Sequence, residues 1–270
     1  MKPIVEGAEQ AIGAMEVSEF DRFDALDYAL AVAKWNCLSD PAAETIVTWE
    51  SWVRAMQVGA ALFDAGMAVG DSVRCRIGSQ GEMKVIPATG PQEYLHAGNW
   101  LTTYYLAVIC RENDRLDGLA RVPVSFLRAS GAEFDEYIYS WVEALQGAWF
   151  GRDEMWNSLV AAVNGTDPAV AHIASAELML NILYPPLELF HRYQLQDSAQ
   201  FNKALADSLV AHKEYWGGDG ARSLSGEGLV ALGPLAIASM AYDAGMPIEV
   251  ESEYLPAELV RFGWAGEIDT

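Results

Sequence analysis

Two Glu-x-x-His pairs are the residues whose spacing most directly suggests chemistry. They are Glu93 with His96 and Glu188 with His191. Residues three apart on a helix lie on one face, so each pair could present a carboxylate and an imidazole to the same metal ion. Di-iron carboxylate bundles combine two such pairs with a Glu from each of two other helices. Intervening predicted helices contain residues that could fill this role, Glu50 and Glu143.

The positions of these pairs argue against a metal site. Pro91 and Pro185-Pro186 are expected to begin helices, which places Glu93 and Glu188 in first turns. Acidic residues are favoured there because they interact with free N–H groups and with the helix dipole. Di-iron ligands should instead project from the middle of long helices. We therefore favour the helix-start interpretation and predict no metal and no cofactor.

No other catalytic pattern stands out. The sequence contains no G-x-G-x-x-G, no phosphate-binding Gly-Lys-Ser/Thr loop, no G-x-S-x-G and no H-E-x-x-H. Cys37, Cys75 and Cys110 lie in apolar patterns without C-x-x-C spacing, which predicts unreactive buried thiols in a reducing compartment. His212 shares an apolar helical stripe with Leu209 and is expected in the core. We predict that the protein has no catalytic residues and is not an enzyme.

An acidic run near the C-terminus is the strongest candidate for a binding surface. Residues 248–254 alternate between apolar or small residues and Glu, which predicts a short strand. One face of that strand would carry three carboxylates, from Glu249, Glu251 and Glu253. One interpretation is a solvated strand face that resists edge pairing. The other is an anionic row that binds Lys or Arg of a partner, supported by nearby acidic residues at Glu258, Glu267 and Asp269.

Hydrophobic periodicity predicts a mainly α-helical protein with one small β-hairpin and the short C-terminal strand. Apolar residues at helical spacing predict helices within 23–37, 49–67, 101–108, 134–148, 201–216 and 229–242. Expected helix starts are Asp40-Pro41, Pro91, Asp167-Pro168 and Pro185-Pro186. Alternation at 73–77 and 83–85, around a turn at 78–81, predicts the hairpin. We expect a single domain over residues 1–270, in which 1–18 is the segment least expected to be ordered.

The chain is strongly acidic. Its 270 residues include 17 Lys or Arg and 38 Asp or Glu, a formal net charge of -21. Such a charge opposes binding to nucleic acid or an anionic membrane and complements a basic protein. The N-terminus has no apolar signal region, and the longest apolar stretch, 229–242, falls short of the roughly 20 residues that a bilayer span needs. We expect a cytoplasmic protein of undetermined oligomeric state.

Six segments in order resemble the immunity 49 family of bacterial polymorphic toxin systems, and their spacing is similar to that of actinobacterial members. They are RCRIG at 74–78, AGNWL at 97–101, LYPP at 183–186 with LFH at 189–191, AHKEYW at 211–216, residues 229–238, and ESEYLP at 251–256. The resemblance covers about Glu44 to the C-terminus. It implies a mainly helical cytoplasmic protein that binds and neutralises a toxin encoded beside it. No catalytic residue carries over from the family.

The identity of the toxin stays open at this point. A basic nuclease is one possibility, because the charge of -21 could mimic nucleic acid and occlude the active site of such a toxin. Two other functions remain as alternatives. One is the di-iron oxidoreductase built on the Glu-x-x-His pairs, and the other is a helical scaffold that binds a small ligand in a Trp-lined groove.

Overall fold

The computed structural model describes residues 2–78, 83–218 and 220–267. This part of the chain is mainly α-helical, as predicted, with a single two-stranded sheet. The elements are α1 (Lys2–Ala14), α2 (Glu19–Ser39), α3 (Ile46–Met67), β1 (Ser72–Arg76), β2 (Met83–Pro87), α4 (Ala97–Ile109), α5 (Asn113–Ala120), α6 (Val124–Arg128), α7 (Glu136–Trp149), α8 (Met155–Gly165), α9 (Ala176–Leu178), the π-helix η1 (Met179–Leu183), α10 (Pro185–Gln194), α11 (Ser198–Gly217), the 3-10 turns η2 (Arg222–Leu224) and η3 (Gly226–Leu229), α12 (Leu232–Asp243) and α13 (Ala257–Arg261).

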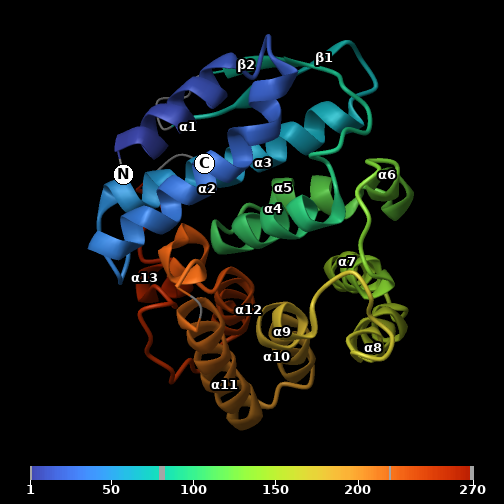
Figure 1. Ribbon diagram of the computed structural model, residues 1–270, viewed down its shortest axis with the longest axis vertical. Coiled ribbons are helices and arrows are strands. Elements are labelled where there is room, and N and C mark those ends of the chain that lie inside the picture. The colour runs from blue at the N-terminus through green and yellow to red at the C-terminus, as the bar shows by residue number, and fades with distance from the viewer. Residues whose placement is uncertain (1, 79–82, 219, 268–270) are drawn as a thin grey trace.

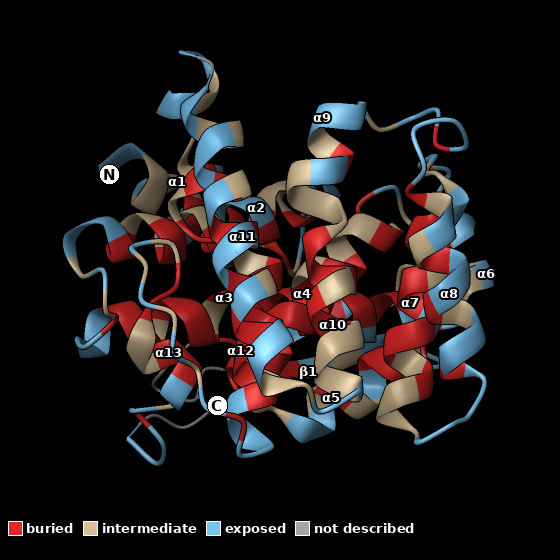
Figure 2. Ribbon diagram, turned by 90° about the horizontal axis from the view of Figure 1, so that it is seen from below, coloured by how far each residue is buried: buried red, intermediate tan, exposed pale blue. Residues whose placement is uncertain are grey.

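Helices α3 and α4 form the centre of the molecule. Figure 1 shows α1, α2 and the hairpin on one side of them and α10 to α13 on the other. Figure 2 shows that buried residues are concentrated in the central helices. Trp52 of α3 and Trp100 of α4 are fully buried, as expected for helices surrounded by other elements. The two helices approach closely at Gly59, where a Cβ atom would lie 2.5 Å from Oγ1 of Thr103.

The hairpin packs on α3, and the N-terminal helix packs on α2. Strands β1 and β2 are antiparallel, with Val73 opposite Ile86, which confirms the predicted hairpin. The predicted turn at 78–81 lies mostly outside the described residues. Residues 2–14, where the sequence shows no clear period, form α1 along α2. No helix in the described part of the chain is both long and apolar enough to cross a membrane.

Three of the four predicted helix starts are wrong. Helix α3 begins at Ile46 after its N-cap Thr45, several residues beyond Asp40-Pro41. Helix α4 begins at Ala97 rather than at Pro91. Residues 167–170 form a turn that no helix continues, although Pro185 does begin α10. A proline therefore marks a change of chain direction here, and it marks a helix start only where apolar packing sustains the helix.

Asp40 shows why the first of these predictions fails. Its carboxylate accepts hydrogen bonds from the amides of Glu44 and Thr45 and from the hydroxyls of Thr45 and Thr48, at 2.7–2.9 Å. It therefore ties together a turn instead of beginning a helix. Burial alone would raise the pKa of Asp40, but these hydrogen bonds to the charged form hold the pKa below its usual range.

The predicted strand at 248–254 is absent. The described chain contains no strand outside the hairpin, and residues 246–251 have no regular structure. A strand needs a neighbour to pair with, and this segment lies against helices instead. The hydrogen bonds to the backbone of this segment therefore come from side chains and from individual amides of neighbouring loops, not from a paired strand.

Candidate partner-binding site

The first Glu-x-x-His pair lies at the start of α4. Glu93 is in the turn before the helix, and His96 is the N-cap, with Nδ1 accepting from the Asn99 amide at 3.1 Å. The His96 ring also packs on Phe134, with ring centroids 5.2 Å apart. Burial lowers the pKa of His96 below its ordinary value. This histidine therefore caps a helix in its neutral form.

The second pair is engaged with its own neighbours on α10. Glu188 contacts Arg192 at 3.4 Å, and the His191 ring meets Trp156 edge to face. Among the described residues, no three His, Cys, Asp or Glu side chains come together as a metal site would require. The Glu-x-x-His pairs and Glu50 and Glu143 therefore do not assemble the alternative di-iron centre.

The cysteines and His212 are part of the core. All three cysteines are buried and unpaired, and burial raises the pKa of Cys37 to about 11, which makes its thiolate scarce at neutral pH. His212 is 5% exposed, and its Nε2 lies 2.9 Å from the carbonyl oxygen of Gly228, to which it donates. Its ring also packs on Tyr254 at 5.2 Å. Burial lowers the pKa of His212 to about 4, so the ring is neutral at physiological pH.

The acidic segment, residues 248–254, keeps the predicted alternation of exposure. Glu249, Glu251 and Glu253 are exposed, whereas Ile248, Val250, Ser252 and Tyr254 are half-buried. The apolar residues of the segment pack against the hydrophobic core. Three carboxylates therefore point to solvent from one short stretch of chain, although the stretch is not a strand.

The buried side chain of Asn202 on α11 holds the first part of this segment. Its Nδ2 donates to the carbonyl oxygen of Pro247 at 2.9 Å, and its Oδ1 accepts from the Glu249 amide at 2.8 Å. Further along, the Ala231 amide donates to the carbonyl oxygen of Tyr254 at 3.0 Å. These contacts satisfy backbone groups that a partner strand would otherwise pair.

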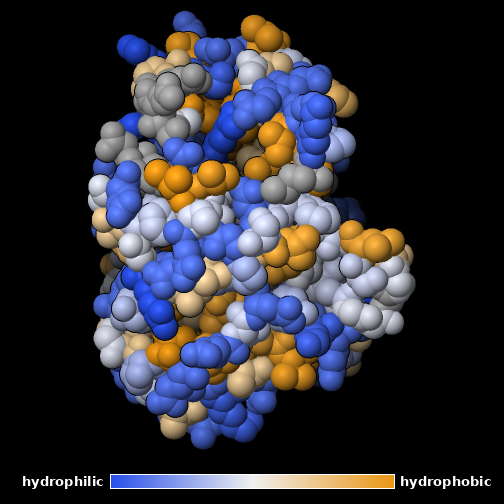
Figure 3. Space-filling model, turned by 90° about the vertical axis from the view of Figure 1, so that its left-hand side faces the viewer, coloured by the Kyte–Doolittle hydropathy of each residue, from blue (hydrophilic) through white to orange (hydrophobic). Residues whose placement is uncertain are grey.

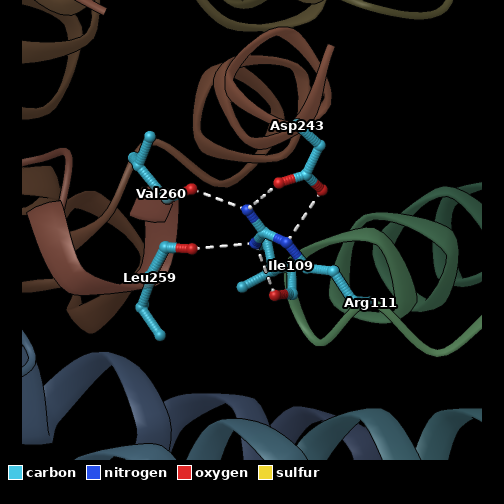
Figure 4. A network of polar contacts seen from close by, with 5 residues as sticks. All are labelled: Ile109, Arg111, Asp243, Leu259 and Val260. Atoms are coloured by element: carbon cyan, nitrogen blue, oxygen red, sulfur yellow. Dashed lines mark hydrogen bonds and ion pairs between the residues drawn. The ribbon is translucent and has the colours of Figure 1, made fainter. Parts of the chain in front are cut away.

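Arg111 fixes both ends of the chain that carries the acidic segment. Figure 4 shows its guanidinium between the last residue of α12 and the helix α13. Nε and Nη2 bind the two carboxylate oxygens of Asp243 at 3.0 Å, and Nη1 and Nη2 donate to the carbonyl oxygens of Leu259 and Val260 at 2.9 and 2.6 Å. Nη1 also donates to the carbonyl oxygen of Ile109 at 2.8 Å. Residues 244–258 are therefore anchored where they leave α12 and where they reach α13.

A groove of about 530 Å³, here called the small groove, runs beside the acidic segment. Ile248, Val250 and Tyr242 give it apolar walls, and the three exposed glutamates also line it. Glu258 lies on the α13 side, where its carboxylate contacts Arg261 at 3.3 Å and its amide donates to the carbonyl oxygen of Ala42. Glu267 is exposed, and Asp269 lies outside the described residues.

A second and larger groove is lined in part by Trp side chains, as in the ligand-binding alternative of the sequence analysis, which did not place such a groove in the fold. This large groove, of about 1040 Å³, lies between α2, α4, α7, η1, α11 and the chain from η3 to the start of α12. Trp141 and Trp216 are among its lining residues. Because these elements are far apart in the sequence, no local pattern could have predicted that they enclose one space. Figure 3 shows that hydrophobic residues on the left-hand face of the molecule form separate groups among hydrophilic ones.

The fold and the site define a mainly α-helical protein with an exposed acidic row and no assembled metal centre among its described residues. The sequence model of one family, immunity protein 49, matches residues 40–259. The match covers most of the chain, and the protein belongs to this family. No curated protein and no solved structure matches the chain.

Proposed function

We propose that the protein is an immunity protein that binds a cognate polymorphic toxin in the cytoplasm of the producing cell and neutralises it without catalysis. The family match over residues 40–259 is the observation that carries this proposal. The family's name implies a toxin as partner. The acidic, anchored segment supplies a surface suited to such a partner.

The acidic segment is the proposed contact. Glu249, Glu251 and Glu253 are solvated charges on a backbone that Asn202 and Arg111 hold in place. A fixed row of charges attracts a basic surface at long range and fixes its orientation, because little conformational freedom is lost on binding. Glu258 lies beyond the end of the segment on α13, where it is half-buried and paired with Arg261, and it is the weakest of the proposed contact residues. Where the toxin is a basic nuclease, these carboxylates take the place of nucleic-acid phosphates and occlude its active surface.

The direct test uses the toxin-like protein encoded beside this gene. Tagged immunity protein and toxin are produced together, and co-purification and rescue of growth are measured. We expect both. If neither is observed while the toxin is shown to be expressed and active, the protein is not an immunity protein for that toxin.

Charge reversal locates the contact. The triple variant Glu249→Lys, Glu251→Lys and Glu253→Lys should weaken toxin binding strongly. A matched control reverses three exposed acidic residues that line neither groove, Glu143, Asp153 and Asp207. Raising the salt concentration from 50 to 500 mM should weaken the wild type more than the triple variant, because screening removes the attraction that the glutamates provide. Equal affinities for the triple variant and the control would place the contact elsewhere.

A further inference from the structure

The large groove has the dimensions of a binding site for an extended group. Its volume of about 1040 Å³ compares with about 530 Å³ for the small groove. Small-molecule sites commonly span about 300–1,000 Å³, so the large groove is at the upper limit of that class. Leu101 and Tyr105 of α4 and Trp141 of α7 line it and are buried. Such a surface favours an apolar side chain or several.

Carboxylates dominate the charge of this groove. Asp24, Asp27, Glu133, Asp135 and Glu227 all line it, and Lys34 is the one Lys or Arg among its described lining residues. The Lys34 ammonium contacts the Glu227 carboxylate at 2.5 Å and its charge also acts on Asp27, but one ammonium against five carboxylates leaves the groove with a net negative charge. The groove therefore repels anions and attracts a cation.

The two aspartates on α2 are the carboxylates best placed to receive that cation. Asp24 and Asp27 are three residues apart, so they lie on one face of the helix. The Asp135 carboxylate, by contrast, already accepts from the backbone amides of residues 172–174 at 2.7–3.1 Å. Partial desolvation, followed by the charges of Glu227 and Asp24, raises the pKa of Asp27, whose side chain is still exposed to solvent, and the Lys34 charge opposes this shift. A bound cation would relieve this unfavourable environment.

Two side chains that line the groove, Tyr137 and Trp216, each contain a buried polar atom without a hydrogen-bond partner among the described residues. Tyr137 lines the groove, is 2% exposed, and its hydroxyl makes no hydrogen bond with another described residue. Buried polar groups are nearly always satisfied, and a phenol can accept from an N–H group or donate to a carbonyl. A peptide segment offers both kinds of group.

The opposite wall contains an unusual backbone element. The π-helix η1 (Met179–Leu183) places residues 181–183 along the groove. A π-helical turn is less stable than an α-helical one and is frequent at functional sites. The large groove and the acidic segment also share a wall. His212 lines the large groove and packs on Tyr254, which is the neighbour of Glu253 in the acidic segment.

We propose that the large groove receives a segment of the cognate toxin that carries an apolar side chain next to a Lys or Arg, with Asp24 and Asp27 binding the cation. This inference rests on the proposed function. The shared wall at His212 and Tyr254 allows one toxin to contact the acidic segment and enter the large groove together.

Two variants test the charged and the apolar half of this proposal separately. The double variant Asp24→Lys/Asp27→Lys reverses the charge of the two aspartates on α2. Its control reverses the charges of Glu143 and Asp153, which are exposed and line neither groove. The variant Ala31→Trp fills the groove from the half-buried lining position Ala31 on α2. Affinity for the purified toxin is measured by calorimetry, after circular dichroism shows that each variant is folded.

We expect the double reversal and Ala31→Trp each to weaken toxin binding at least about tenfold, and the control to change it less than about threefold. If the wild type binds the toxin and both groove variants bind it equally well, the inference is overturned and the proposed function stands. If the wild type itself does not bind the active toxin, both are overturned. A variant that does not fold is replaced by Asp27→Asn or Thr102→Phe, for which a loss of affinity larger than that of the control is expected.

Discussion

The walls of the large groove are formed by helices packed through apolar side chains, whereas the acidic segment has no regular structure and is held by polar contacts to its backbone. Leu101, Tyr105 and Trp141 position the groove as part of the core. Asn202 and Arg111 position the segment through hydrogen bonds to specific carbonyl and amide groups. The same protein thus builds two acidic surfaces by different means.

This difference predicts different responses to mutation. A groove wall shared among several helices tolerates a change at any one exposed lining position, because many contacts remain. A segment without a hydrogen-bonded neighbour depends on a few side chains, and each of them satisfies several backbone groups. Single polar substitutions should therefore disturb the acidic segment more than the groove.

The largest effect is expected for Arg111→Ala. Arg111 donates five hydrogen bonds at 2.6–3.0 Å, and its side chain is 13% exposed. Its loss leaves the carbonyl groups of Leu259 and Val260 without this donor and should lower the free energy of unfolding by about 3 kcal/mol. Urea unfolding measures the change. Arg111→Lys should lose less because it keeps the charge, and Ala31→Trp in the groove wall should change stability little. A loss below about 0.5 kcal/mol for Arg111→Ala would contradict the role of Arg111 in anchoring residues 244–258.

An effect of similar size on the free energy of unfolding, seen only at acidic pH, is expected from His212, which lies between the large groove and the acidic segment. The pKa of His212 is lowered to about 4 in the folded protein by burial, against about 6.5 in an unfolded chain. The unfolded state therefore binds more protons between these values, so stability falls as the pH drops from about 6.5 to about 4. The nearby Lys34 charge acts in the same direction.

The His212 contribution is isolated by comparison with His212→Gln. The wild type should lose on the order of 3 kcal/mol more than the variant between pH 7 and pH 4. Carboxylates titrate in both proteins, so their effect cancels in the difference. Urea unfolding across this pH range gives both curves. Parallel curves would show that His212 is protonated as easily in the folded protein as in the unfolded one.

The sequence predicted those elements whose own residues determine them. Sustained apolar stripes predicted the long helices, because burial of one face decides helix formation more than any end signal. The exposure of Glu249, Glu251 and Glu253 was predicted for a similar reason, since a carboxylate is solvated whatever backbone carries it. The predicted strand at 248–254 was wrong, because alternation indicates which side of the chain faces the core but does not indicate whether a second strand is present to pair with it.

Features that depend on distant residues were not predictable. Asp40 ends α2 and ties a turn together through Thr45 and Thr48, which capping patterns alone could not distinguish from a helix start. The large groove combines side chains from α2 to α12, and Arg111 gains its role only where α13 returns to meet it. These features come from tertiary packing, which no local window of sequence contains.

A smaller effect is expected for Asn202→Ala. The Asn202 side chain is 8% exposed and connects α11 to the backbone at Pro247 and Glu249. Its removal should cost about 1–2 kcal/mol and should speed hydrogen exchange at the Glu249 amide, which loses its acceptor. In Asn202→Asp an oxygen remains for this amide, so its protection should be retained better. Unchanged exchange in Asn202→Ala would mean that apolar packing of Ile248 and Val250 alone holds the segment.

The smallest effect on stability is expected for Lys213→Ala. The Lys213 ammonium lies 3.8 Å from the Glu253 carboxylate, and both side chains are about two-thirds exposed, at 68% and 65%. An ion pair this exposed is screened by water, so its loss should change the free energy of unfolding by less than about 0.5 kcal/mol. The substitution nevertheless frees Glu253 and makes the acidic row more negative. Association with the toxin should therefore become faster at low salt while dissociation changes little, which stopped-flow fluorescence can measure. Slower association would show that Lys213 itself contributes to the contact, and that the acidic row does not act alone.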